Sequence, residues 1–582
     1  MSQETKNCQN CKQDFVIESD DFDFYEKIGV PVPTWCWKCR FPRRLAWRNE
    51  RSLYKRTCNL CNKSMISMFR PEAPFPVYCH DCWWSDKWDP LKYGRDYDFS
   101  KNFFEQFDLL QREVPRPDLY ASQNVNSDYC NHTAHNKDCY LLFGSWFNEN
   151  CSYSSNMADS KNCWDSAFVQ DCESCLHSID VNKCYQTHFS QNCTGCTDSA
   201  FLYDCRNCQN CLFCYNLRNQ SYNVFNKQVS KEEFLRIKEA TLGSYTLLEK
   251  RLQEFQKTIR EKAIHKYMVG DHNLNVSGDS IYNAKNTHFS FFVEGGENLK
   301  YTFKAIKGQK DTVDTFGVNG GELGYESNNV DFSSKVLFSL NGENNRNTEY
   351  LIDSFGAENC FGSISLNHKK YCILNKQYDE KTYEELREKI VAQMKEQPYS
   401  DKAGRKYFYG EFFPLELSPF AYNETIAQEF APITAKRAKE LDYPWQEPAD
   451  KGYKPTKRWD ELPDTILEVD DSILQETILC EAWDKDKEKA KEHQCSMAFK
   501  ITKDELAVYR KFNLPLPRKC PNSRNFDKFQ LRNPVNLWHR QCMCDKTHAT
   551  HAGKCTNEFE TSYSPERKEI VYCEQCYQSE VV

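Results

Sequence analysis

The chain has 582 residues, of which 27% are charged and 40% hydrophobic, and its net charge is −8. This length exceeds what one hydrophobic core usually serves, roughly 250–300 residues, so we expect several domains. No stretch approaches the ~18 consecutive apolar residues of a membrane span, and the acidic balance excludes a polycation, so any nucleic-acid surface must be local. Because the sequence opens without a basic and apolar leader, its 31 cysteines predict a cytoplasmic protein with reduced thiols.

The N-terminal region, residues 1–98, begins with eight cysteines in four CxxC pairs. Each pair directs two thiolates toward one point, and two pairs complete the tetrahedral arrangement of a structural zinc site. We therefore predict paired zinc ribbons. The first site comprises Cys8, Cys11, Cys36 and Cys39, and the second comprises Cys58, Cys61, Cys79 and Cys82. Four thiolates leave no open coordination position, so the metal would be structural; the alternative is a set of core cysteines without metal.

A basic, aromatic-rich segment joins the first ribbon to the second. Its cations are Arg40, Arg43, Arg44, Arg48, Arg51, Lys55 and Arg56, and Glu50 is the single acid among them. Guanidinium groups suit phosphate, and the interleaved Trp and Tyr rings suit base stacking. The segment is thus a candidate nucleic-acid contact. The alternative is that these arginines hold the ribbons to each other and to acidic faces of the middle region.

Residues 99–120 predict a helix, because apolar residues recur at helical spacing until Pro115 and Pro117. We expect this helix to cap the open end of the block that follows, since an uncapped end would expose unpaired strand edges.

Residues 121–229 contain thirteen further cysteines in a regular order. Cys130, Cys151, Cys172, Cys193 and Cys214 recur every 21 residues, and Asn or Asp often precedes a cysteine. A fixed period near 20 residues is typical of a solenoid, so we predict a β-solenoid with stacked Cys and Asn. The run from Cys205 to Cys214 resembles the start of an iron–sulfur motif, although packing of small apolar thiols is the favoured interpretation.

The middle of the chain is duplicated. Residues 359–377 match residues 210–228 at an offset of 149, and a charged helical pattern follows each copy. We therefore predict a helical connector over 230–272, a second β-solenoid block over 273–378, and a helix with an extended connector over 379–475. The second block keeps only Cys360 and Cys372.

The C-terminal region, residues 476–582, repeats the N-terminal ribbons, first at an offset of 484 and then of 494 residues. The last zinc site should comprise Cys542, Cys555, Cys573 and Cys576, with Cys544 as an alternative to Cys542. His548 and His551 lie in the ten-residue insertion and are either ligands or exposed loop residues. The preceding ribbon is degenerate. It offers Cys480, Cys495 and Cys520, with His493 as a fourth candidate. We expect about three zinc ions, or four if this ribbon holds metal.

The segments CWKCRFPRRLAWRNERSLYKRTCNLC, VYCHDCWWSDKWDP and NEFETSYSPERKEIVYCEQCYQSEVV resemble an uncharacterised family of tandem zinc-ribbon proteins. The resemblance implies a Cys/Asn-rich repeat region between paired ribbons. The expected fold is therefore mainly β with helices, with paired ribbons at both termini flanking a two-block β-solenoid.

The sequence shows no nucleophile motif, phosphate-binding loop or HExxH helix. We therefore expect a non-enzymatic, zinc-binding scaffold that binds a macromolecule. Nucleic acid or a nucleic-acid-bound complex is the leading partner class, a pure protein–protein scaffold is the alternative, and no membrane partner is expected. An enzyme or an iron–sulfur protein that uses the solenoid is the least favoured hypothesis.

Overall fold

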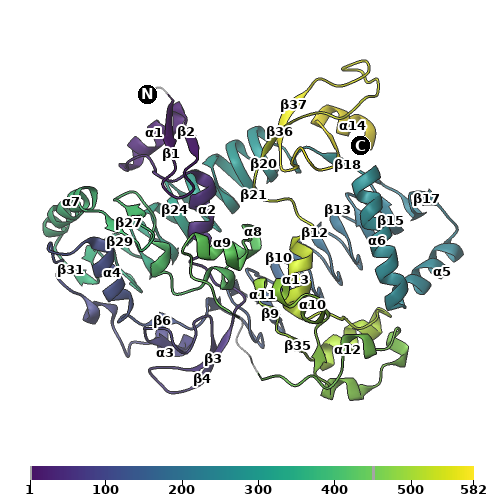
Figure 1. Cartoon of the computed structure of the whole chain (residues 1–582), viewed down its shortest axis with the longest axis horizontal. Coiled ribbons are helices and arrows are strands. Elements are labelled where there is room, and N and C mark those ends of the chain that lie inside the picture. The colour runs from purple at the N-terminus through teal and green to yellow at the C-terminus, as the bar shows by residue number, and fades with distance from the viewer. Residues whose placement is uncertain (1–2, 448–451) are drawn as a thin grey trace.

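A computed structural model describes residues 3–447 and 452–582. The fold is mainly β, with two large sheets in the middle of the chain and small two-stranded sheets toward both ends (Figure 1). Within the described residues, no helix has the length and apolar character that crossing a bilayer requires.

The first large sheet, here called the first array, contains nine strands in sequence order. Its strands are β9 (Tyr140–Phe143), β10 (Ser152–Ala158), β11 (Ala167–Gln170), β12 (Ile179–Asn182), β13 (Gln191–Thr194), β14 (Ala200–Tyr203), β15 (Gln209–Tyr215), β16 (Ser221–Val224) and β17 (Lys227–Gln228). The strands from β9 to β16 pair in parallel, each residue with the residue 12 positions later, as Met157 does with Val169. The 21-residue register expected from the cysteines is therefore wrong.

A three-residue period of the backbone explains both the 12-residue pairing of the strands and the 21-residue spacing of the cysteines. Every third residue from Gln123 to Phe225 has a positive φ, as at Asn150, where φ is 54°. Asn, Asp and Gly adopt this left-handed conformation most readily, because other side chains crowd the following carbonyl. The cysteines of the array occupy positions directly after such residues, as Cys151 does, and they are buried. The 21-residue spacing combines a 12-residue step with a nine-residue step, and both are multiples of three.

The buried thiols of the first array carry hydrogen bonds between successive strands. The Cys163 amide donates to Cys151 Sγ at 3.3 Å, and the Ser166 amide donates to Ser154 Oγ at 3.0 Å. Cysteine and serine thus perform the same task, which is to satisfy a buried backbone N–H group. Small size and acceptor capacity explain why both residue types fill these positions.

The second array is a 13-stranded sheet whose strands, except β31, also pair in parallel, mostly at a 12-residue offset. Its strands are β19 (Gly270–Asp271), β20 (Leu274–Tyr282), β21 (Lys285–Lys300), β22 (Phe303–Phe316), β23 (Asn319–Glu322), β24 (Tyr325–Asp331), β25 (Ser333–Leu337), β26 (Leu340–Glu343), β27 (Arg346–Glu349), β28 (Ile352–Phe355), β29 (Glu358–Phe361), β30 (Cys372–Ile373) and β31 (Lys376–Gln377). The register shifts at Gly278, where φ is 148° and a Cβ atom would lie 1.8 Å from the Ser290 carbonyl oxygen. Only glycine fits this bulge.

The two arrays end alike. In the first, β16 pairs antiparallel with β17, and α5 (Lys231–Leu242) follows; in the second, β30 pairs antiparallel with β31, and α7 (Glu380–Glu396) follows. Asn226 and Asn375 each bond both backbone groups of the residue 11 positions earlier. These positions are 149 residues apart, which is the offset of the sequence duplication.

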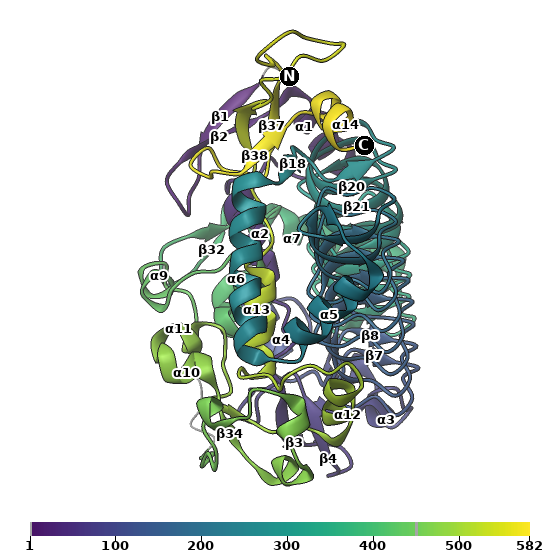
Figure 2. The ribbon, with the colours of Figure 1, turned by 90° about the vertical axis from the view of Figure 1, so that its right-hand side faces the viewer.

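Helices cover the sides of the arrays. The long α6 (Tyr245–Lys262) stands beside the stacked strands of the first array (Figure 2), where Phe255 contacts Phe201 and Phe213. The helix α4 (Phe103–Gln111) packs on the second array instead, because the Phe103 ring meets Tyr350 and Phe361 at 5.1 Å. The expectation that residues 99–120 cap the first block is therefore wrong.

The ribbons are small hairpins that are each followed by a helix. Their hairpins are β1 (Glu4–Asn7) with β2 (Asp14–Ile17), β3 (Tyr54–Thr57) with β4 (Ser64–Ser67), β34 (Ile478–Leu479) with β35 (Ala498–Phe499), and β36 (Trp538–Gln541) with β37 (Glu558–Thr561). The helices of the four ribbons are α2 (Trp37–Leu45), α3 (His80–Trp83), α13 (Pro521–Phe529) and α14 (Glu574–Val581). A cysteine stands at the N-cap of each: Cys36, Cys79, Cys520 and Cys573.

Candidate functional site

Three complete sets of four cysteines converge in the ribbons. They are Cys8, Cys11, Cys36 and Cys39; Cys58, Cys61, Cys79 and Cys82; and Cys542, Cys555, Cys573 and Cys576. The Cys11–Cys36 and Cys61–Cys79 sulfur atoms are both 3.7 Å apart, and those of Cys555 and Cys573 are 4.0 Å apart. Two thiolates that each lie ~2.3 Å from one tetrahedral zinc are ~3.8 Å apart. The spacing therefore fits one ion in each set.

Backbone amides prepare the first thiolate of each set. Cys36, Cys79 and Cys573 donate their N–H groups to Cys8, Cys58 and Cys542, all at 3.3 Å. Burial opposes ionisation of Cys58, but the N–H groups of Cys61, Cys79 and Leu60 outweigh it and lower its pKa to about 7. A lower thiol pKa favours the thiolate that zinc requires.

The hydrogen bond from a backbone amide to the first thiolate also shows which cysteine begins the last set. Cys542, rather than Cys544, accepts the equivalent N–H group, so Cys542 takes the position that Cys8 and Cys58 occupy in the other ribbons. The inserted residues bring a second set together beside it, made of Cys544, His548, His551 and Cys576. Both histidines lie near thiols and are partly buried, so the exposed-loop interpretation of them is wrong.

The degenerate ribbon holds three converging thiols, those of Cys480, Cys495 and Cys520. Ser523 stands where the fourth thiol would be, with its Oγ 3.3 Å from the Cys520 sulfur. The His493 Nε2 atom is 3.0 Å from the Ser523 hydroxyl. His493 thus sits behind the serine, which fills the fourth position.

The basic segment after the first ribbon is turned inward. Arg40, Arg43 and Arg44 are at most 2% exposed. Arg43 contacts Glu326 and Glu411, both at 2.8 Å; Arg40 contacts Asp314 at 2.6 Å and Arg44 contacts it at 2.9 Å. Three guanidinium groups and three carboxylates, here called the buried ion cluster, therefore join α2 to the second array and to the connector after it.

The remaining cations of this segment are also engaged, apart from Lys55, whose side chain is exposed. Arg48 pairs with Glu50 at 2.7 Å, Arg51 lies 3.7 Å from Glu429, and Arg56 donates to the Arg70 carbonyl at 2.9 Å. Phosphate cannot reach side chains that are buried against carboxylates. The assignment of this segment to nucleic-acid contact is therefore wrong for its buried arginines, and the alternative interpretation, in which they hold the ribbon to acidic faces, fits the structure.

Acidic partners dominate the electrostatics of the cluster. Burial lowers the pKa of the Arg43 guanidinium, but Glu326 and Glu411 outweigh it and raise that pKa well above its usual value. Burial raises the pKa of Glu326, and Arg43 and Arg44 oppose that rise. The two carboxylates thus keep Arg43 charged inside the protein.

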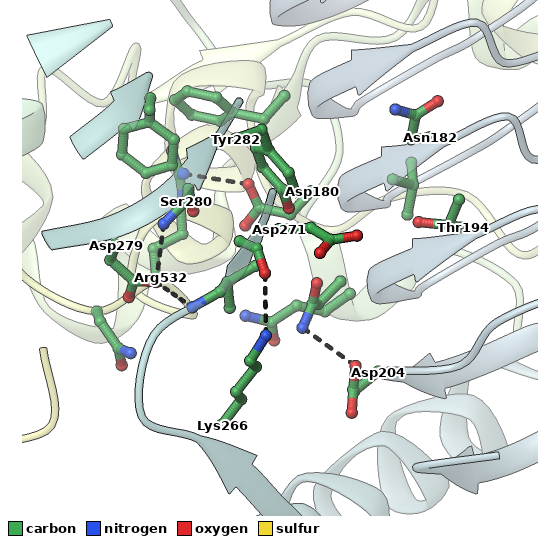
Figure 3. Close-up of a pocket in the computed structure, with 18 of the residues that line it drawn as sticks. Asp180, Asn182, Thr194, Asp204, Lys266, Asp271, Asp279, Ser280, Tyr282 and Arg532 are labelled. Atoms are coloured by element: carbon green, nitrogen blue, oxygen red, sulfur yellow. Dashed lines mark hydrogen bonds and ion pairs between the residues drawn. The ribbon is translucent and has the colours of Figure 1, made fainter. Parts of the chain in front are cut away.

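A cavity of about 1180 Å³ lies where the two arrays meet (Figure 3). Strands of both arrays, α6 and the C-terminal ribbon form its walls. Many of its lining side chains are amides, including Gln170, Asn182, Gln191, Asn207, Asn283 and Asn533, and aromatic rings such as Trp146 and Tyr282 lie among them. No sequence pattern indicated this cavity, because its walls come from segments that are far apart along the chain.

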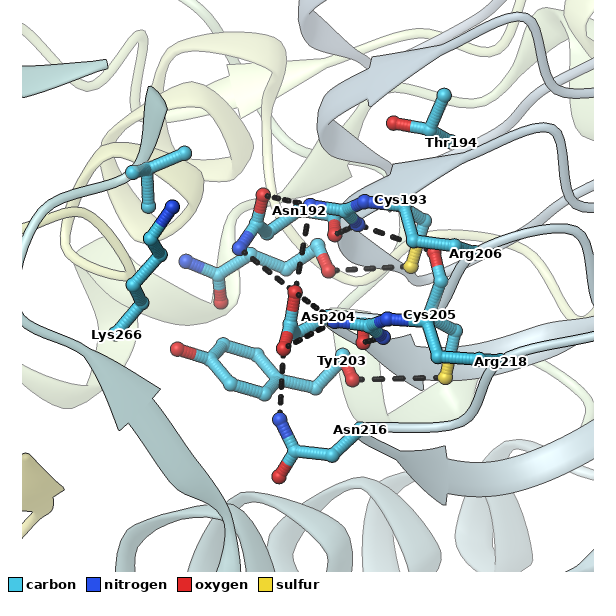
Figure 4. Close-up of polar contacts among 12 residues, drawn as sticks. Asn192, Cys193, Thr194, Tyr203, Asp204, Cys205, Arg206, Asn216, Arg218 and Lys266 are labelled. Atoms are coloured by element: carbon cyan, nitrogen blue, oxygen red, sulfur yellow. Dashed lines mark hydrogen bonds and ion pairs between the residues drawn. The ribbon is translucent and has the colours of Figure 1, made fainter. Parts of the chain in front are cut away.

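Several charged groups around the cavity are paired. Asp180 meets Arg532 at 3.1 Å, and the Arg532 guanidinium lies 3.5 Å from the centre of the Phe168 ring. On the neighbouring strands, Asp204 accepts from Asn216 at 2.7 Å and pairs with Arg218 at 3.3 Å (Figure 4). These contacts hold the walls of the cavity in place.

The C-terminal ribbon forms one wall of the cavity. The strand β18 (Ile264–Lys266) pairs in parallel with β38 (Ile570–Tyr572) of that ribbon. Lys266 Nζ, which lies at the cavity wall, is 2.9 Å from both the Glu574 carboxylate and the Gly270 carbonyl. The ribbon therefore joins the end of the first array to the start of the second.

No protein-family model matches the sequence, and no curated protein matches it.

Proposed function

We propose that the chain is a non-enzymatic, zinc-binding scaffold whose central cavity holds an extended segment of a partner protein. In this proposal each array is a β-solenoid of 12-residue coils, and structural zinc ions fix the ribbons that join the two solenoids. The cavity at the junction of the arrays is the observation that carries the proposal.

The solenoid assignment is supported by the regular register. Successive strands pair 12 residues apart through both arrays, and left-handed residues recur at every third position of the first. Such stacking buries backbone polar groups between successive coils, and each coil needs its neighbours to do so. The two arrays then provide rigid walls for a cavity.

A structural role for zinc is supported by how the ribbons are attached. Four thiolates complete the coordination of one zinc ion, which leaves no position for substrate. The helix of the first ribbon is joined to the second array by the buried ion cluster, and the last ribbon is joined to β18 by strand pairing. Loss of zinc should therefore loosen the junction of the arrays.

A polypeptide fits the cavity better than a small molecule or a nucleic acid. Its volume is above the ~300–1,000 Å³ of small-ligand pockets. Each amide side chain offers both a donor and an acceptor, which match the N–H and C=O groups of a peptide backbone. The six carboxylates and seven cations that line it nearly balance, whereas nucleic-acid grooves are strongly positive.

Site-specific photo-crosslinking tests this proposal. A photoreactive side chain would replace Thr194, which lines the cavity, or Thr197, which lies on the same array outside it, in chains expressed in their native cells. We expect a protease-sensitive adduct from position 194 and little from position 197. Equal adducts from both positions, or a nuclease-sensitive adduct, would overturn the cavity assignment.

A second arm uses a cavity-filling substitution. Thr194→Trp should abolish capture of the partner that was crosslinked, while Thr197→Trp should retain it, with equal zinc content in both variants. Unmodified protein should not bind single- or double-stranded oligonucleotides even at low salt, where electrostatic attraction is strongest. Salt-dependent oligonucleotide binding would favour the nucleic-acid scaffold instead.

A further inference from the structure

Two ligand sets meet at one cysteine in the last ribbon. Cys576 belongs to the four-cysteine set with Cys542, Cys555 and Cys573, and also to the set with Cys544, His548 and His551. In each set, all ligand atoms lie within 4.8 Å of one another. A single zinc ion accepts four ligands, so one ion cannot use all seven residues.

The second set has the geometry of a metal site. The Cys544 sulfur is 3.1 Å from His548 Nε2, and the Cys576 sulfur is 3.1 Å from His551 Nε2. A thiolate at ~2.3 Å and an imidazole nitrogen at ~2.0–2.1 Å from one tetrahedral zinc lie ~3.5 Å apart. A shift of a few tenths of an ångström would admit the ion.

The inserted loop fixes both imidazoles. The His548 amide donates to the His551 carbonyl at 2.8 Å, which closes a tight turn that holds the two rings near each other. His551 Nδ1 lies 2.9 Å from the Gly553 carbonyl oxygen, so Nδ1 carries the proton and donates it there. The Nε2 lone pair of His551 then points toward the site, as in metal-bound histidines.

We propose that the last ribbon holds two zinc ions that share the Cys576 thiolate. One ion is bound by Cys542, Cys555, Cys573 and Cys576, and the other by Cys544, His548, His551 and Cys576. A thiolate sulfur has three lone pairs and can therefore bind two ions at once. With only one Zn²⁺ present, the five thiolates of the two sets would leave a large buried negative charge. The second Zn²⁺ offsets most of this charge.

The other ribbons provide an internal comparison. The second ribbon has the same hairpin and helix without the insertion, and its converging set consists of Cys58, Cys61, Cys79 and Cys82. The ten added residues carry both histidines. The bridged site thus assigns a role to the insertion that distinguishes the last ribbon from the second one.

Native mass spectrometry of the purified full chain tests the bridge. The double variant His548→Gln, His551→Gln should carry one zinc ion fewer than the unmodified chain, and Cys576→Ser should carry two fewer. His539→Gln, an exposed histidine on β36 of the same ribbon, should leave the zinc count unchanged. If the double histidine variant keeps every ion, the second site does not exist.

Cobalt(II) substitution separates a bridged pair from ligand loss through misfolding. The unmodified chain should give absorption bands of both sulfur-only and mixed sulfur–nitrogen tetrahedral sites. The double histidine variant should retain the sulfur-only bands of the last ribbon, which also shows that this ribbon remains folded. Loss of both sets of bands from that variant, or identical spectra for the two proteins, would overturn the proposal.

Discussion

Replacing Arg43 with Gln tests whether the basic segment is structural. Arg43 contacts Glu326 and Glu411 at 2.8 Å, and all three side chains are at most 3% exposed. The substitution leaves two carboxylates buried without their cation, and breaking a buried pair in this way costs about 3–5 kcal/mol. That is a large fraction of the roughly 5–15 kcal/mol that stabilises a folded protein.

Hydrogen exchange is the suitable assay, because a protein of several domains does not unfold in a single two-state step. Exchange of the α2 amides, Trp37–Leu45, should accelerate roughly 100-fold to several thousand-fold, since each 1.4 kcal/mol is a factor of ten. Lys55→Gln, at the exposed position of the same segment, should leave this exchange unchanged. The pair Arg43→Gln, Glu411→Gln should cost less than the sum of its single substitutions, because the two groups interact.

One outcome would contradict a structural role for Arg43. Unchanged exchange of α2 in Arg43→Gln, together with weaker oligonucleotide binding, would show that the guanidinium is available to phosphate. The buried ion cluster would then be open to solvent in the protein in solution.

Three further predictions concern the arrays and the cavity wall. Cys172→Ser should be nearly neutral, whereas Cys172→Ala should cost about 1–2 kcal/mol, because it leaves the Cys184 amide without its acceptor; hydrogen exchange of the first array compares them, with zinc content unchanged in both. Asn150→Gly should be tolerated, whereas Asn150→Val should cost about 1–2 kcal/mol at a φ of 54°, as measured by the same method. Burial lowers the pKa of Lys304 to about 8. The charged side chain therefore destabilises the folded state by its full amount below pH 8. This destabilisation disappears above the usual lysine pKa of ~10.5, where Lys304 is neutral in both the folded and the unfolded state. Relative to Lys304→Met, the unmodified protein should therefore gain up to about 3 kcal/mol of unfolding free energy as the pH rises through this window, and parallel curves would contradict the assignment.

Local patterns predicted well which cysteines come together. A CxxC pair and its partner lie within one hairpin and one helix, so spacing alone was enough to group Cys58 and Cys61 with Cys79 and Cys82. The same logic placed Cys542 and Cys555 in one set across an insertion, because the flanking residues repeat an earlier ribbon. It did not settle whether His548 and His551 are ligands or exposed loop residues, since loop conformation decides whether a histidine turns inward.

The period of the arrays was harder to read. Cysteine occupies only some of the inward positions, and Ser, Asn, Val and Leu fill the others. Counting cysteines therefore gave a spacing of 21, while the backbone repeats every three residues and pairs every 12. The Asn and Asp residues before the cysteines carried the correct signal, because they mark the left-handed positions.

The basic segment shows the limit of counting charges. Its acidic partners Asp314 and Glu326 lie some 270–290 residues later, so the local excess of arginine resembled an exposed patch. The cavity was invisible for the same reason. Contacts between distant segments decide both features, and a single sequence does not reveal which acid will meet which guanidinium.

Zinc stoichiometry is the most direct test of whether metal ions hold the ribbons together. Native mass spectrometry of the full chain, purified without chelators, should show at least three zinc ions, one in each complete four-cysteine set. Cys8→Ser and Cys58→Ser should each remove one ion, and a strong chelator should release the ions and accelerate hydrogen exchange where β18 meets β38. A chain that carries one zinc ion or none, yet keeps the slow exchange of the ribbons, would contradict the account.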